Sequence, residues 1–100
     1  MRSPVKCALA DALLAMMPGL VTNALSRTEW HSATFAGQRL IIEMAVPATA
    51  DQESITAFRN GLPTHEFELK RGIVADILVT NVAENAGLVT LTIEALVLDA

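Results

Sequence analysis

Hydrophobic residues recur at helical spacing near the start of the chain. They form one stripe of a helix predicted from Pro4 to Met17: Val5, Ala8, Leu9, Ala12, Leu13 and Met16. Ser3 is placed to cap this helix, and Pro4 suits its first turn, where no amide hydrogen is needed. Pro18-Gly19 ends it. Because Asp11 interrupts the apolar run, the pattern favours an amphipathic helix over a secretory signal.

The segment from residue 30 to 39, WHSATFAGQR, divides two runs that alternate between hydrophobic and polar residues. A three-residue loop, Phe35-Ala36-Gly37, would give the glycine the left-handed position and place Trp30 opposite Ile42. Trp30 would then share a face with the aliphatic side chains of the second strand, which predicts a core position for its ring. The opposite face would carry the polar side chains of this hairpin: Glu29, His31, Arg39 and Glu43.

A second helix is predicted from about Ala50 to Asn60. Thr49 and Gln52 match a capping box at its start, and Gly61 followed by Pro63 is typical of a helix end. The apolar edge of this helix has three members: Ile55, Phe58 and Leu62. We expect this edge to face a sheet.

The last third of the chain predicts three further strands. The first is HEFELK at residues 65–70, which Lys70-Arg71-Gly72 would join to IVADILVTNV, and AENAG then leads into LVTLTIEALVL. The element order is α-β-β-α-β-β-β, and two helices are too few to cover both faces of a five-stranded sheet. We therefore predict a single α+β domain over residues 1–100, a two-layer sandwich with a mainly antiparallel sheet and both helices on one face.

The sheet face without helices keeps more apolar residues than an open face normally does. With Val79 opposite Ile93 in the last hairpin, four apolar side chains point to this face: Val74, Leu78, Leu96 and Leu98. Such an island is typical of a surface that binds another protein, and two sheets stacked about a twofold axis would cover it. The alternatives are tolerated surface aliphatics or an N-terminal segment that wraps across the face.

Composition strengthens the expectation of a protein partner. Hydrophobic residues make up 52% of the chain and charged residues 18%, against about 45–50% and about 25% in typical domains. The formal net charge is −4 without a basic run, which argues against nucleic acid as a partner. No apolar run is long enough to span a membrane. Since Cys7 is the single cysteine, no internal disulfide is possible and a reducing cytoplasm is the expected location.

Catalytic chemistry has little support, and we assign no catalytic residue and no cofactor. The predicted registers place Glu29 opposite Glu43 and Glu66 opposite Asp76, and like charges across a strand pair need a cation or a proton between them. One interpretation is a site for a divalent cation or for acid–base catalysis: Glu29, His31, Glu43 and Asp76. The other is neutralisation by nearby basic side chains, or a register that differs by one residue.

Three functions therefore stay open. The pattern favours a small cytoplasmic homo-oligomer whose open sheet face binds a second copy or another protein. The second hypothesis is a module that binds a small apolar ligand in a pocket between helices and sheet, near Trp30 and Phe58. The third is a small enzyme that uses His31 with nearby carboxylates. The residues match no motif of a characterised family closely enough to transfer a function.

Overall fold

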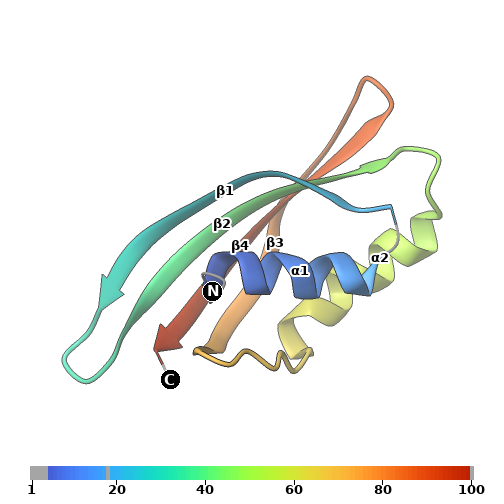
Figure 1. Cartoon of the computed structure of the whole chain (residues 1–100). Helices are drawn as coiled ribbons and strands as arrows, with labels where there is room; N and C mark the ends of the chain where they lie inside the picture. Colours follow the sequence, from blue (N-terminus) through green and yellow to red (C-terminus); the bar gives the residue numbers. More distant parts are fainter. Residues whose placement is uncertain (1–4, 18, 100) are drawn as a thin grey trace.

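The computed structural model describes residues 5–17 and 19–99, apart from the side chain of Val5. Within these ranges, two α-helices lie on one face of a four-stranded antiparallel sheet (Figure 1). The elements are α1 (Val5–Met16), β1 (Val21–His31), β2 (Ala36–Pro47), α2 (Gln52–Gly61), a 3-10 turn η1 (Leu62–Thr64), β3 (Gly72–Asn85) and β4 (Leu88–Asp99). The predicted cap at Ser3 and Pro4 and the predicted helix end at Pro18 lie outside the described residues.

The prediction of five strands in the order α-β-β-α-β-β-β is wrong, because residues 65–70 form no strand of the sheet. An isolated bridge joins Leu69 to Gly72 at the start of β3. Phe67 and Leu69 are partly buried against the core, whereas the residues that alternate with them are exposed. The alternation in this segment therefore reflects the one-sided burial of a connection between α2 and β3, not strand pairing.

Two hairpins lie side by side in the sheet. The strand order is β1-β2-β4-β3, so β2 and β4 pair in the centre and β1 and β3 form the edges. Figure 1 shows α1 and α2 on the same side of the sheet, with the strands curving around them. The other side, which we call the outer face, is therefore convex, and neither helix of the described residues covers it.

The core lies between the helices and the two central strands. The strand side chains that are buried there are Leu40, Ile42, Met44 and Val46 from β2, and Val89, Leu91, Ile93, Ala95 and Val97 from β4. Leu9 and Leu13 of α1 are completely buried against them, and Ile55 and Phe58 of α2 are buried as predicted. Each such side chain stabilises the fold by about 1.5–3 kcal/mol relative to exposure.

α2 begins at Gln52 because Asp51 caps it. Asp51 has an extended backbone, and its Oδ1 accepts a hydrogen bond of 3.1 Å from the Glu53 amide. The Ser54 hydroxyl donates to Asp51 Oδ2 at 3.2 Å. The predicted capping box of Thr49 and Gln52 is therefore wrong, and a carboxylate at the cap adds a favourable interaction with the positive end of the helix.

The hairpin of β1 and β2 has a longer loop than the sequence suggested. His31 pairs with Ala36, which leaves residues 32–35 as the loop. The Ser32 amide donates to the Phe35 carbonyl oxygen at 2.8 Å, and the Phe35 amide donates to Ser32 Oγ at 3.0 Å. The serine hydroxyl thus closes a four-residue turn that needs no glycine.

This loop changes the face to which Trp30 belongs. Trp30 pairs with Gly37 and not with Ile42, and the difference is an odd number of residues. An odd shift moves every side chain of one strand to the other face of the sheet. The predicted core position of Trp30 is therefore wrong: the ring lies on the outer face, where it is half-buried.

Bulges interrupt both edge strands. In β1 the extra residue is Asn23, and in β3 the extra residues are Ala75 and Thr80. Between the two bulges of β3, Val79 pairs with Ile93 as predicted. Outside that interval the register differs from the predicted one by one residue, which reverses the face of the side chains there.

Candidate functional site: the outer face of the sheet

Apolar side chains from all four strands gather on the outer face. We call this group the outer patch, and its members are Trp30, Ile41, Ile73, Leu78, Leu96 and Leu98. Ile73 is 59% exposed, and Ile41 and Leu78 are each 40% exposed. The other members are half-buried. An open antiparallel face normally turns polar residues to water, so this patch is the feature of the fold that calls for an explanation.

One row of the outer patch crosses the sheet near the β1–β2 loop. Leu98 of β4 pairs with Gly37 on one side and with Ile73 on the other. Trp30 pairs with Gly37 from the edge strand. Since glycine has no side chain, nothing projects from the backbone between Trp30 and Leu98.

The next rows mix charge with apolar residues. Leu96 lies between Arg39 of β2 and Asp76 of β3. Glu94, one row further along β4, lies between two apolar residues, Ile41 and Leu78. The row of Leu96 therefore carries a positive, an apolar and a negative side chain on the neighbouring strands β2, β4 and β3.

The sequence placed half of this patch on the outer face, and its role as an interface stays a prediction. The outer face holds three of the four residues expected there: Leu78, Leu96 and Leu98. Val74 instead pairs with Val97 and packs against the core, because the bulge at Ala75 shifts the start of β3. Ile73 takes its place opposite Leu98.

Sequence reasoning missed Ile41, Ile73 and Trp30 as members of the patch. Ile41 alternates with Arg39 and Glu43, so its outward direction was legible, but the neighbouring strand was not. The pairing of β2 with β4 brings Ile41 next to the residues of the second hairpin. Strand order is a property of the whole fold, and no local pattern in this chain encodes it.

Gly37 is required by a close approach of two backbones. A Cβ atom at this position would collide with the carbonyl oxygen of Val97 and lie 2.9 Å from the Leu98 Cα. Both groups belong to the backbone of β4 and have little freedom to move. The missing side chain beside Trp30 is therefore a fixed feature of the outer face.

The predicted constellation of carboxylates and histidine does not assemble. Glu29 pairs with Gln38, which places Glu29 and His31 on the helix side of the sheet, whereas Glu43 and Asp76 lie on the outer face. The predicted opposition of Glu29 with Glu43 is therefore wrong. Glu66 lies outside every strand, so its predicted opposition to Asp76 is wrong as well. In the described ranges, no group of three or more His, Cys, Asp or Glu residues could hold a metal ion.

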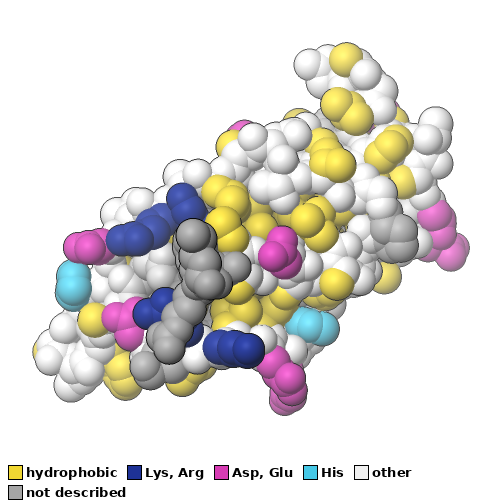
Figure 2. All heavy atoms as spheres, in the orientation of Figure 1, with side chains coloured by type: hydrophobic (Ala, Val, Ile, Leu, Met, Phe, Trp, Pro, Cys, Tyr) yellow, Lys and Arg dark blue, Asp and Glu magenta, His cyan; other side chains and the backbone are white. Residues whose placement is uncertain are grey.

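A polar cluster does form at the end of β1, on the helix side. Arg27 Nη2 lies 3.7 Å from Glu29 Oε1, and His31 Nε2 lies 3.9 Å from Glu29 Oε2. These side chains line an open recess of about 240 Å³ with Gln38 and Asp99. Figure 2 shows Lys or Arg, Asp or Glu and His side chains side by side at the left of the view, where Figure 1 has the end of β1. The Arg27, Glu29 and His31 side chains are 47%, 72% and 67% exposed, so water screens their interactions.

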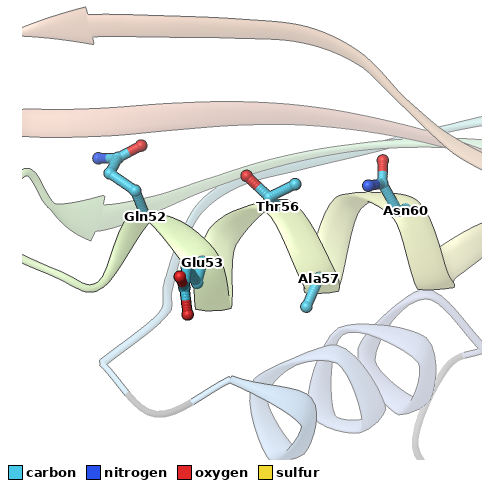
Figure 3. Close-up of a pocket in the computed structure, with 5 residues that line it drawn as sticks. All are labelled: Gln52, Glu53, Thr56, Ala57 and Asn60. Atoms are coloured by element: carbon cyan, nitrogen blue, oxygen red, sulfur yellow. The ribbon is translucent and has the colours of Figure 1, made fainter.

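The predicted ligand pocket near Trp30 and Phe58 is not formed by these two residues. Phe58 is buried in the core beneath α2, and Trp30 lies on the opposite side of the sheet. A shallow recess of about 360 Å³ lies instead along α2, lined by Gln52, Glu53, Thr56, Ala57 and Asn60. Figure 3 shows Gln52, Thr56 and Asn60 in line along one side of the helix.

Cys7 and His65 lie outside the outer patch and the polar cluster. Cys7 is a free, half-buried thiol on α1. The ring of His65 packs edge-on against Phe67, with centroids 4.5 Å apart and an angle of 65° between the planes. Among the described residues, no helix combines the length and the hydrophobicity that crossing a membrane requires.

Comparison with known proteins leaves the outer face as the main guide to function. No family model, no curated protein and no solved structure matches this chain.

Proposed function

We propose that this protein is a self-associating module whose outer face binds the outer face of a second copy. The observation that supports it is the outer patch, in which apolar side chains from all four strands lie on a sheet face without helices. Ile41, Ile73 and Leu78 are the most exposed of them. Stacking two such faces removes this surface from water, as in sandwiches of two sheets.

The expected strength follows from the size of the patch. Stacking covers twelve partly exposed apolar side chains, six from each copy, and at about half of the value for full burial this contributes on the order of 9–18 kcal/mol. Association costs about 4–15 kcal/mol in lost translational and rotational freedom and in side-chain ordering. Since the two ranges overlap, we expect a weak association that depends on protein concentration.

The single cysteine, Cys7, is a free, half-buried thiol, which agrees with a cytoplasmic location for this module. Fractionation of the producing cells would test this location.

The test is the molar mass in solution of the wild type and of two variants. Leu96→Glu puts a charge in the middle of the outer patch and is expected to give a folded monomer. Leu88→Glu makes the same change on the same strand and face, but Leu88 lies eight positions away, opposite Pro47 and Asn85. This control is expected to keep the wild-type mass.

Light scattering after size exclusion measures the mass, and circular dichroism shows whether each variant is folded. A folded Leu96→Glu variant that associates as strongly as the wild type would overturn the proposal. If the wild type is a monomer at every concentration, the outer face does not bind its own copy.

A further inference from the structure

The edges of the sheet argue for face-to-face contact between copies. β1 and β3 are the free edges, and a second copy could in principle extend the sheet at either one. Bulges at Asn23 in β1 and at Ala75 and Thr80 in β3 interrupt both edges. Because bulges bend a strand and break its hydrogen-bonding register, they disfavour edge pairing.

The charged side chains on the two sides of Leu96 have opposite signs, so two outer faces can match each other's charges there in one relative orientation. Arg39 and Asp76 flank Leu96 on the two neighbouring strands, and each is exposed. Their backbones are two strand spacings apart, about 9.6 Å, with Leu96 between them. Among the described residues, the ion pairs within the chain involve neither of them.

We infer that two copies stack by their outer faces about a twofold axis that runs parallel to β4 above Leu96. This inference rests on the proposed function and adds the geometry of the contact. Rotation about this axis preserves the position along β4 and exchanges the β2 side with the β3 side. Leu96 then meets the partner's Leu96, and Arg39 faces the partner's Asp76 twice, once on each side of the axis.

The neighbouring rows fit the same operation. Gly37 and Ile73 are the two neighbours of Leu98, so the rotation places the partner's Ile73 above Gly37, beside Trp30. The position without a side chain thus receives the most exposed side chain of the outer patch. In the row of Glu94, Ile41 meets the partner's Leu78 in the same way, and Glu94 meets the partner's Glu94 on the axis, a like-charge contact that weakens the association.

Other axes in the plane of the sheet fit less well. An axis perpendicular to the strands at Leu96 would bring Arg39 against the partner's Arg39 and Asp76 against the partner's Asp76. Like charges held together at an interface oppose association. An axis between β2 and β4 would place Ile41 against the partner's Glu94 and would leave Asp76 without a basic counterpart.

The contact is small. Three rows across four strands span roughly 19 by 20 Å, on the order of 400 Å² in projection. Standard interfaces bury about 800 Å² of accessible surface on each partner. The convex outer face limits the contact further (Figure 1). We therefore expect a dimer that dissociates on dilution.

A charge exchange tests the axis. Arg39→Asp and Asp76→Arg each create two like-charge pairs in the proposed dimer. Each is expected to raise the dissociation constant of the dimer roughly tenfold or more. The double variant Arg39→Asp/Asp76→Arg re-forms both pairs with the signs reversed and is expected to return close to the wild-type value. Arg59→Asp on α2 and Glu84→Arg near the tip of β3 are the controls, because they change the net charge equally at exposed sites outside the outer patch.

Sedimentation equilibrium gives the dissociation constants, and thermal unfolding shows that the variants are folded. If Leu96→Glu abolishes association but the double variant stays as weak as the weaker single variant, the axis is wrong while the proposed function stands. Equal weakening by the control variants would attribute the effect to net charge and would also overturn the axis. A wild type that never associates contradicts the proposed function itself.

Discussion

Trp30 lies directly opposite Gly37 in the pair of β1 and β2, on the convex face of the sheet. Beyond Gly37 in the same row stand Leu98 and Ile73. The large ring is therefore separated from the next apolar side chain by a position that has none. This relationship explains why the face is uneven, whereas residue 37 has to be glycine because a Cβ there would collide with the backbone of β4.

Gly37→Ala is expected to lower the free energy of unfolding by about 1–3 kcal/mol. The added Cβ would collide with the Val97 carbonyl oxygen and press on the Leu98 Cα, so the central pair of strands has to separate locally. Chemical denaturation measures the change. Gly61→Ala is the control, since a Cβ at Gly61 meets no heavy atom within 4 Å. Equal stability of Gly37→Ala and the wild type would show that the two backbones are not in close contact.

Asp51→Ala is expected to destabilise the protein by about 1 kcal/mol, because the first turn of α2 loses the acceptor for the Glu53 amide. Thr49→Ala, at the position that the sequence suggested as a cap, is expected to change the stability by a few tenths of a kcal/mol at most. Thermal unfolding of the two variants compares them. The reverse order of effects would place the cap at Thr49.

Ala86→Asn is expected to raise the stability by about 0.5–1 kcal/mol. Ala86 and Gly87 form the turn between β3 and β4 with φ of 53° and 79°, and positive φ is costly for alanine but common for asparagine in such turns. The same change at Ala83, within β3, serves as the control and is expected to give no gain. A lower melting temperature for Ala86→Asn than for the wild type would contradict the turn geometry.

Glu94→Gln is expected to tighten self-association several-fold. Glu94 lies on β4 one row from Leu96, so the proposed axis brings it near the partner's Glu94, and two carboxylates repel each other there. Sedimentation equilibrium compares this variant with Glu84→Gln, which removes the same charge near the tip of β3. If Glu94→Gln binds no more tightly than the control, Glu94 is far from the axis.

The sequence predicted correctly those features that depend on residues close together in the chain. Leu9 and Leu13 of the predicted α1 stripe are buried as expected, and so are Ile55 and Phe58 on the edge of α2. The pairing of Val79 with Ile93 also follows from alternation in the last hairpin. In each case, the spacing of residues within one element or one hairpin carries the information.

The errors arose where register depends on a single residue. The loop at residues 32–35 is closed by the Ser32 hydroxyl, whereas the glycine that suggested a shorter loop serves the close approach to β4. Ala75 and Thr80 form bulges without glycine, so neither was marked in the sequence. Each such residue changes the face of the sheet to which the neighbouring side chains of its strand point. This is why the sequence predicted the wrong side for Trp30 and Val74.

The molar mass of the wild-type protein over a series of concentrations tests the central claim most directly. The chain has a mass of 10.7 kDa. Self-association through the outer face predicts a weight-average mass that rises with concentration and approaches twice the chain mass. A mass that stays at 10.7 kDa up to the highest concentration that remains in solution would contradict the account.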